Sequence, residues 1–220
     1  MGAEVSELLA VRYAESVMKE CMVFQGGSED KDYPISFTIY LLKTKNKLIL
    51  VDVGCDTFPG FDMRNHRKPV DVLKEYGYSA DDITDVVITH AHYDHIAAIH
   101  YYPKAMVHIQ LDEYLNGKRY IPKGFQVKTF EKEATIDNCV VVKNIGGHSI
   151  GSCIVLFEKE DKTYVISGDE CYSQKCFSNQ IPTGASICPQ KSREFIEKFG
   201  DEKYYMLIEH DINAIVGKIY

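Results

Sequence analysis

The segment His90-Ala91-His92-Tyr93-Asp94-His95 constrains this chain more than any other, because four of its six residues carry metal-binding side chains. Imidazole nitrogens and carboxylate oxygens are ligands for zinc and related divalent metals. The residues directly before it, Asp85-Val86-Val87-Ile88-Thr89, have the composition of a buried strand. A fold that contains this segment must therefore place the four side chains where a strand ends and a loop begins, a common place for functional groups.

Three more side chains of the same kind follow other apolar segments. His148 lies in a glycine turn after the predicted strand 140–142, Asp169 follows 164–166, and His210 follows 204–208. A single histidine after a strand is usually structural, whereas repeated strand ends with suitable side chains favour one shared metal site. The other three histidines lie in a charged loop, just beyond the hexapeptide and in an alternating strand, and we interpret them as non-ligands: His66, His100 and His108.

The hydrophobic pattern predicts strands and short helices along most of the chain. The expected strands are 35–42, 47–53, 85–89, 105–110, 139–143, 152–157, 163–167 and 204–208. The expected helices are 69–76, 112–118 and 189–199. The turn-like residues 43–47 predict a hairpin between the first two strands, and residues 56–68 read as a loop with an apolar tip. Residues 1–20 mix acidic and apolar side chains, and no element is predicted there.

Length and composition exclude several classes of protein. The 220 residues suffice for one sizeable α/β domain or two small ones. The net charge of -7 argues against a nucleic-acid partner. No stretch approaches the roughly 20 apolar residues of a membrane span, and residues 1–20 lack the pattern of a signal peptide. We therefore expect a cytoplasmic protein without a membrane or nucleic-acid partner. The seven cysteines include no C-x-x-C pair, so free thiols are expected, with Cys171 as a packing residue.

The order and rough spacing of these motifs resemble the metallo-β-lactamase fold superfamily. The resemblance rests on the H-x-H-x-D-H hexapeptide, the later Gly147-His148 and Gly168-Asp169 pairs and the final His210-Asp211 pair, and it extends from Leu48 to the C-terminus. It implies an α/β fold, an αββα sandwich of two packed mixed β-sheets flanked by helices. It also implies a single metallo-β-lactamase-like hydrolase domain over residues 1–220 with its metals at one edge of the sandwich.

The same resemblance implies a site with two metal ions, expected to be two Zn²⁺ with iron or manganese as alternatives. One ion is held by residues matching His90, His92 and His148 and the other by those matching Asp94, His95 and His210, with Asp169 between them. Three imidazoles leave zinc an open position for water, and a second metal lowers the pKa of that water further. Asp52 also ends a strand, and it either orients a ligating imidazole, as a similar family residue does, or forms a turn.

Within the superfamily, the chain resembles most the N-acyl homoserine lactonase group. Tyr172 stands three residues after Asp169, where those lactonases have a tyrosine that points into the site. A phenol there can donate a hydrogen bond to a developing oxyanion, and the alternative is a packing aromatic. Residues 96–99 and Ile150 depart from the small residues and the proline usual in those lactonases, which leaves the substrate open.

The expected function is that of a dinuclear zinc hydrolase that opens a lactone or cleaves a similar small ester by attack of a metal-bridging hydroxide. In this hypothesis Tyr172 stabilises the oxyanion, and Asp94 passes a proton to the leaving alkoxide. Candidates for an apolar acyl-chain pocket are Phe24, Phe58, Phe61 and Tyr93. The alternatives are a thioesterase or phosphodiesterase on the same dinuclear site, or a non-catalytic metal-dependent sensor. The oligomeric state stays open.

Overall fold

The computed structural model describes residues 4–219, and all the strands of this part of the chain belong to two sheets that face each other. The strands are Glu7–Lys19 (β1), Asp32–Lys43 (β2), Leu48–Val51 (β3), Asp85–Ile88 (β4), Met106–Gln110 (β5), Gln126–Phe130 (β6), Glu133–Ile136 (β7), Val140–Asn144 (β8), Cys153–Lys159 (β9), Lys162–Ile166 (β10), Tyr204–Leu207 (β11) and Gly217–Ile219 (β12). The helices are Glu20–Val23 (α1), Pro69–Glu75 (α2), Tyr93–Ile96 (α3), Leu111–Gly117 (α4), Lys175–Asn179 (α5) and Pro189–Phe199 (α6).

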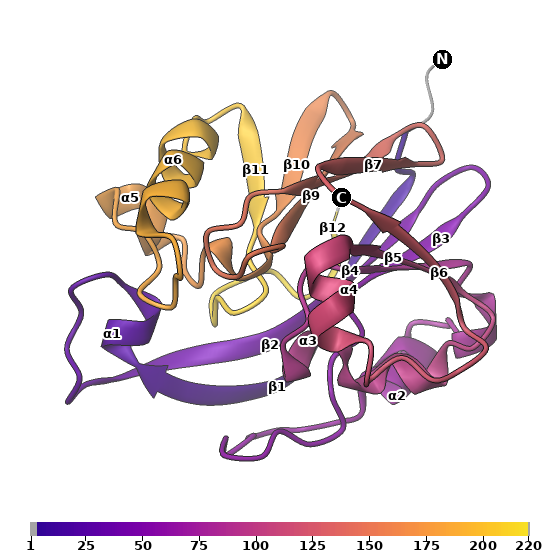
Figure 1. Cartoon of the computed structure of the whole chain (residues 1–220), viewed down its shortest axis with the longest axis horizontal. Coiled ribbons are helices and arrows are strands. Elements are labelled where there is room, and N and C mark those ends of the chain that lie inside the picture. The colour runs from indigo at the N-terminus through magenta and orange to yellow at the C-terminus, as the bar shows by residue number, and fades with distance from the viewer. Residues whose placement is uncertain (1–3, 220) are drawn as a thin grey trace.

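Both sheets are mixed, and each is covered by helices on its outer face. The larger sheet has the order β12-β1-β2-β3-β4-β5-β6, and the smaller has the order β11-β10-β9-β8-β7. Figure 1 shows α5 and α6 beside the smaller sheet and α2, α3 and α4 beside the larger one. This arrangement is the αββα sandwich expected from the sequence. Within residues 4–219, no helix combines the length and apolar character needed to cross a bilayer.

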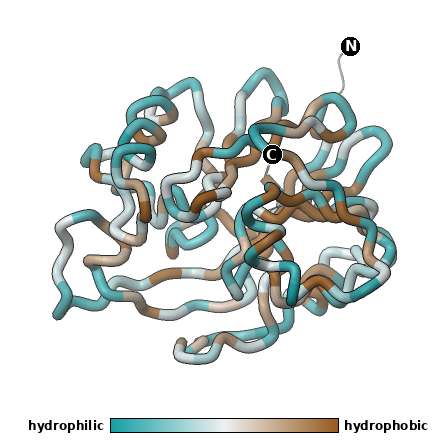
Figure 2. The backbone as a smooth tube through the Cα atoms, viewed as in Figure 1, coloured by the Kyte–Doolittle hydropathy of each residue, from teal (hydrophilic) through white to brown (hydrophobic). Residues whose placement is uncertain are grey.

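Three hydrophobic clusters fill the spaces between these layers. In β1, Leu8 and Ala10 point into the cluster between the sheets, whereas Leu9 and Val11 point into the cluster beneath α2 and α3. Because alternate residues of a strand face opposite sides, a strand covered on both sides must be apolar at consecutive positions. A third cluster packs α5 and α6 on the smaller sheet and includes Cys171. Figure 2 accordingly shows brown segments along the inner strands and teal segments at the peripheral turns.

Most of the predicted elements are present, with end shifts of a few residues. The predicted strands 35–42 and 47–53 form the antiparallel hairpin β2–β3, although β3 ends at Val51 and β2 starts at Asp32. The sequence interpretation missed β1, β6, β7 and β12. The charged Arg12 interrupts the apolar pattern of β1. Its guanidinium can lie there because it donates hydrogen bonds to the backbone carbonyls of Asp211, Ile212 and Ala214, about 200 residues away. Such partners are invisible in a local window.

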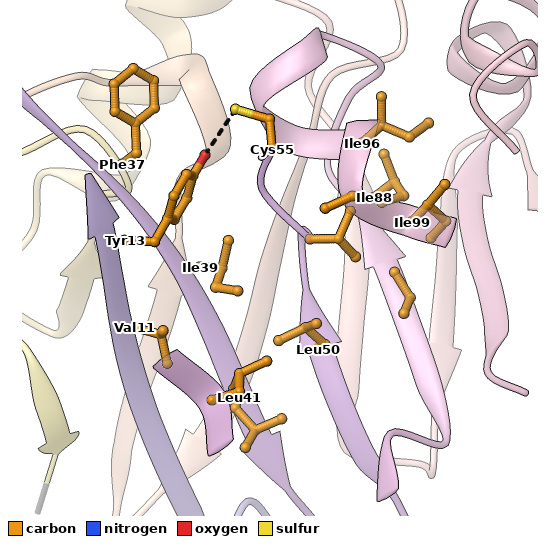
Figure 3. Packing of buried hydrophobic residues seen from close by; sticks show 14 of the residues in the cluster. Val11, Tyr13, Phe37, Ile39, Leu41, Leu50, Cys55, Ile88, Ile96 and Ile99 are labelled. Carbon is orange, nitrogen blue, oxygen red and sulfur yellow. Dashed lines mark hydrogen bonds between the residues drawn. The ribbon is translucent and has the colours of Figure 1, made fainter. Parts of the chain in front are cut away.

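The missed strand β1 supports the hexapeptide directly. The hydroxyl of Tyr13 donates a hydrogen bond to the backbone carbonyl of Asp94 at 3.0 Å and lies 3.8 Å from the sulfur of Cys55. Figure 3 shows the Tyr13–Cys55 contact within the packed cluster around Phe37, Ile39 and Ile96. Tyr13 is buried, so this bond connects the hydrophobic core to the loop that carries the predicted ligands.

Candidate metal centre

The seven predicted ligand residues converge at one edge of the sandwich from four separate segments. They are His90 and His92 in the loop after β4, Asp94 and His95 in α3, His148 between β8 and β9, Asp169 after β10, and His210 after β11. The strands β3, β4 and β5 are parallel to one another, and β10 is parallel to β11. Carboxyl ends of parallel strands meet at the same sheet edge, so strand-end residues that are distant in sequence come together there.

The first group of ligand-type atoms consists of three imidazoles and one carboxylate: His90, His92, His148 and Asp169. Nδ1 of His92 lies 3.0 Å from Nε2 of His90 and 2.9 Å from Nε2 of His148. Oδ2 of Asp169 lies 3.6 Å and 3.4 Å from the same two Nε2 atoms. Three nitrogens and one oxygen therefore surround a common point.

The second group consists of Asp94, His95 and His210. Nε2 of each histidine lies 3.6 Å from Oδ2 of Asp94. Oδ1 of Asp169 lies 3.1 Å from Nε2 of His95 and 3.0 Å from Nε2 of His210. The two carboxylate oxygens of Asp169 thus face different groups, which is the placement that a bridging residue needs.

Acceptors on the outer side of three imidazoles determine which nitrogen points inward with a free lone pair. Nδ1 of His95 contacts the carboxylate of Asp52 at 2.7 Å, Nδ1 of His210 contacts the carbonyl of Ser36 at 2.8 Å, and Nδ1 of His148 contacts the carbonyl of Ala185. A carbonyl or carboxylate oxygen accepts, so each Nδ1 donates and the inward Nε2 is unprotonated in the neutral ring. This is the tautomer that binds a metal.

Asp52 is therefore an orienting residue as well as a turn residue. Its carboxylate also accepts hydrogen bonds from the backbone nitrogen of Thr89 at 2.8 Å and from the hydroxyl of Thr89 at 2.6 Å. Asp52 has a positive φ of 55°, which is uncommon outside glycine and places its carboxylate between β4 and α3. The two alternatives left open by the sequence are thus both fulfilled by one residue.

The buried charges of the centre fit bound cations. Besides Asp94 and Asp169, the surrounding buried acids are Asp52, Glu113, Glu170 and Glu209. Among residues 4–219, Lys159 at the far end of β9 is the one lysine or arginine that is buried. Buried carboxylates require a compensating charge. Nε2 of His95 and Oδ1 of Asp169 moreover have no hydrogen-bond partner among the described residues.

The pKa shifts of the centre agree with this requirement. Burial opposes ionisation of Asp169, but the imidazoles of His210 and His95 outweigh it and hold the pKa of Asp169 well below its usual range. Burial also opposes a charged His95, yet the carboxylates of Asp169 and Asp94 hold the pKa of His95 well above its usual value. The field inside the centre therefore favours positive charge. Five imidazoles and two carboxylates form a donor set that suits zinc and its neighbours among the divalent metals.

Tyr172 lies beside the ligand groups and also belongs to the hydrophobic cluster beneath α2 and α3. Its hydroxyl donates a hydrogen bond to Oδ2 of Asp169 at 2.6 Å, and its ring stacks on that of His210 with centroids 4.9 Å apart. Burial and the neighbouring Asp169 raise the pKa of Tyr172 well above its usual value. The phenol consequently keeps its proton at neutral pH and remains a hydrogen-bond donor.

Glu113, which no sequence pattern indicated, joins the two histidine-bearing loops. Its carboxylate accepts hydrogen bonds from the backbone nitrogen of Ala91 at 2.7 Å, the hydroxyl of Ser149 at 2.7 Å and the backbone nitrogen of Gly151 at 2.9 Å. Gly117 lies one turn later on the same face of α4, and a Cβ there would be 2.6 Å from Cβ of Ala91. Nothing in the polar composition of α4 indicated that this one glutamate is buried.

A second missed carboxylate, Glu170, supports the loop of His148 from the other side. It accepts hydrogen bonds from the backbone nitrogens of Gly147 at 3.0 Å and His148 at 3.2 Å, and from the hydroxyl of Ser152. Burial raises the pKa of Glu170. Its position directly after Asp169, at the end of an apolar strand, was an available signal. Glu209 carries the same signal beside His210, and its carboxyl lies 3.7 Å from Nδ1 of His95.

A pocket of about 400 Å³ opens onto the centre, which is within the range of small-molecule sites. It is lined by ligand-type residues, by Tyr172 and by an apolar wall that includes Phe58, Phe61 and Tyr93. Phe24, the fourth residue expected there, instead lines a neighbouring hollow and packs edge-on against Tyr33 at 5.0 Å. Phe24 directly follows the short helix α1 and packs against both the cluster that contains Tyr172 and the cluster beneath α5 and α6.

The three histidines interpreted as non-ligands lie apart from the two groups. His108 in β5 contacts the carboxylate of Asp85 through Nε2 at 2.8 Å. His66 packs edge-on against Tyr13 with ring centroids 6.4 Å apart, and His100 packs against Tyr101 at 4.1 Å. Each of these rings thus has a structural contact elsewhere in the fold.

A family profile described as the Metallo-beta-lactamase superfamily matches residues 36–192. That span contains the hexapeptide, His148 and Asp169, and it ends before His210.

Curated relatives with similar sequences carry one name. The N-acyl homoserine lactonase AiiA of Bacillus thuringiensis subsp. kurstaki is 24% identical over 201 residues, which covers 79% of this chain and 80% of that protein. The N-acyl homoserine lactonase AiiB of Agrobacterium fabrum is 29% identical over 110 residues, covering 42% of this chain and 38% of that protein.

Solved structures share the fold. A variant of B. thuringiensis AiiA with N-decanoyl-L-homoserine bound at the active site superposes with a TM-score of 0.83 at 22% identity, covering 95% of this chain and 94% of that one. AidC, described as a dizinc quorum-quenching lactonase, superposes with a TM-score of 0.76 at 18% identity, covering 96% of this chain and 92% of that one. At these identities the superpositions establish the architecture.

Proposed function

The chain belongs to the metallo-beta-lactamase superfamily, and from this premise we propose that this metal-dependent hydrolase opens the ring of N-acyl homoserine lactones or of a similar small lactone. The observation that carries the proposal is the pocket in which both ligand groups, Tyr172 and an apolar wall meet. Its combination of a polar reactive end and an apolar side suits an ester with an acyl chain. The curated relatives named N-acyl homoserine lactonase point to the same reaction.

We assign two zinc ions to the two groups, with iron or manganese as alternatives. One position comprises His90, His92 and His148, the other comprises Asp94, His95 and His210, and Asp169 contributes one oxygen to each. When bound, the metals would supply Lewis acidity for the carbonyl and lower the pKa of water so that a hydroxide nucleophile forms near neutral pH.

Two side chains of the protein can stabilise the oxygens that gain negative charge in the reaction, which are the carbonyl oxygen and the oxygen of the leaving alkoxide. The phenol of Tyr172 is protonated and already donates into the pocket, so it can donate to the carbonyl oxygen as this becomes an oxyanion. Asp94 lines the same pocket and is the carboxyl group suited to carry a proton to the leaving alkoxide. The buried acceptors behind the imidazoles keep the ligand geometry fixed during turnover.

Metal analysis combined with a substrate comparison tests this function. We expect about two zinc-class ions per chain after reconstitution, and hydrolysis of N-acyl homoserine lactones faster than that of matched thioesters or phosphodiesters. Asp169→Asn should lower the metal content, because one carboxylate then no longer serves both groups. A clear preference for thioesters or phosphodiesters would show that the protein hydrolyses that class of substrate instead of lactones. Full metal loading without hydrolysis of any ester would favour a sensor.

A further inference from the structure

One side chain in the same pocket, Arg119, has chemistry that the proposed reaction does not use. Arg119 follows α4, is exposed, and lines the pocket that contains His92, Asp94 and Tyr172. It is the one lysine or arginine among the described residues that line this pocket. Its Nη2 donates a hydrogen bond to the hydroxyl of Tyr120 at 2.9 Å, and its guanidinium carbon lies 4.8 Å from the centroid of the Tyr120 ring.

The other arginines have partners that Arg119 lacks. Arg12, Arg64 and Arg67 each lie within 4.0 Å of a carboxylate oxygen, and Arg193 donates to the side-chain carbonyl of Gln25. Within residues 4–219, no carboxylate lies within that distance of the Arg119 guanidinium. The chain has 32 acidic and 25 basic residues, yet no acidic side chain among residues 4–219 forms an ion pair with Arg119. Apart from the hydrogen bond to Tyr120, none of the five donors of Arg119 has a partner among the described residues.

An aromatic wall leads from the metal centre to this guanidinium. Phe61 stacks on Phe58 with centroids 4.4 Å apart, and Phe58 stacks on Tyr93 at 5.9 Å. Tyr93 stands between the ligand residues His92 and Asp94 and meets Tyr120 edge-on at 5.8 Å. The guanidinium of Arg119 lies over the ring of Tyr120. A ligand that reacts at the centre and extends past Tyr93 toward Tyr120, away from Phe58 and Phe61, therefore reaches Arg119.

We propose that the acyl group of the substrate ends in a carboxylate, which Arg119 binds while the reacting ester lies at the metal centre. The planar guanidinium matches a carboxylate in a bidentate geometry, and its stacking on Tyr120 limits its freedom before binding. This inference rests on the proposed lactone hydrolysis and adds the class of acyl chain.

Pairs of substrates that differ only at the far end of the acyl chain test the inference. N-hexanoyl and N-adipoyl homoserine lactone form one pair, and N-decanoyl and N-sebacoyl homoserine lactone form a longer one. We expect the carboxylate-ended member of one pair to have the higher kcat/KM by about tenfold, as for a charge-assisted hydrogen bond that is partly exposed. The difference should lie in KM, because the contact is remote from the reacting atoms.

The matched variants are Arg119→Gln and Lys118→Gln, which remove the same charge from adjacent exposed residues, of which Arg119 alone lines the pocket. Arg119→Gln should abolish the preference, whereas Lys118→Gln should retain it. Equal kcat/KM for both members of both pairs would overturn the inference, and so would equal effects of the two variants.

A binding measurement keeps this inference separate from the proposed function. Ring-opened N-adipoyl homoserine, titrated calorimetrically into the metal-loaded protein, should bind about tenfold more tightly than ring-opened N-hexanoyl homoserine, and Arg119→Gln should remove the difference. If no lactone is hydrolysed but this difference is present, the proposed reaction fails and the carboxylate site stands. If the two compounds bind equally, the carboxylate site is wrong whichever lactones are hydrolysed.

Discussion

Oδ2 of Asp52 lies 2.7 Å from Nδ1 of His95, on the side of the imidazole opposite Asp169, whose Oδ1 lies 3.1 Å from Nε2. The ring is thus held between the carboxylate of Asp52, which accepts the Nδ1 proton, and the carboxylate of Asp169, which lies at Nε2. Both contacts are buried. The orientation of His95 is therefore determined by the fold rather than by the hexapeptide in which it stands.

Asp52→Asn tests this relationship. The carboxylate of Asp52 accepts two hydrogen bonds from Thr89 and one from His95. An amide has one acceptor oxygen, so its nitrogen would face another donor in at least one of these contacts. We expect the metal affinity of the Asp94–His95–His210 group to fall about 10- to 100-fold. Chelator competition measures this affinity, with circular dichroism to show that the fold is kept. Unchanged affinity of both groups would mean that Asp52 acts as a turn residue alone.

Glu113→Gln should weaken the other group. The amide retains the size of the side chain but can no longer accept from Ala91, Ser149 and Gly151 together. We expect a loss of about 2–3 kcal/mol in unfolding free energy, because buried donors lose a charged acceptor. Metal affinity at the His90–His92–His148 group should fall with it. Denaturant unfolding and chelator competition measure the two effects, and the exposed Glu197→Gln is the matched control. Equal behaviour of the two variants would exclude the role of Glu113.

Tyr172→Phe distinguishes a role of Tyr172 in turnover from a role in holding the metal ligands. The ring can still stack on His210, but the donor to Asp169 and to a developing oxyanion is removed. We expect kcat to fall about 10- to 1,000-fold while the metal content stays the same. Steady-state kinetics with metal analysis on the same samples provides the comparison. Wild-type kcat in the variant would reduce Tyr172 to a packing residue.

Asp85, at the start of β4, predicts a pH dependence of stability away from the metal centre. Burial opposes its ionisation, but hydrogen bonds from His108, Thr84 and Lys47 outweigh burial and lower its pKa from 3.8 to about 2. A folded-state pKa below the unfolded one stabilises the fold at pH values above about 4, and this contribution is lost as the pH falls through about 2. Asp85→Asn should therefore cost about 1–2 kcal/mol at neutral pH.

Urea unfolding of wild type and Asp85→Asn at several pH values tests the sign of this effect. The difference between the two proteins should be constant near neutral pH and shrink as the pH falls from about 4 toward 2. A difference that is independent of pH over this range would show that the contact contributes through packing instead of charge.

The fold could be predicted to a large extent because each strand is apolar over a short window. The apolar segments that form β2, β4, β9 and β10 were predicted as strands for this reason. β1 does not, since Arg12 and Glu15 interrupt its pattern, and the carbonyls that accommodate Arg12 come from residues 211–214. Phe24 lines a neighbouring hollow and not the expected pocket, because its place at the end of α1 depends on how that helix packs on the sheets.

The kinds of ligand atoms, their order and their positions at strand ends can be inferred from the sequence, because donor chemistry and strand periodicity are local properties. Three relationships appear only in the folded chain: Asp169 turns one oxygen to each group, Glu113 joins the loops of Ala91 and Gly151, and Arg119 lines the pocket. These relationships depend on strand order, register and the path of loops across the sheet edge. They join side chains that are up to 80 residues apart, and no local pattern encodes such distances.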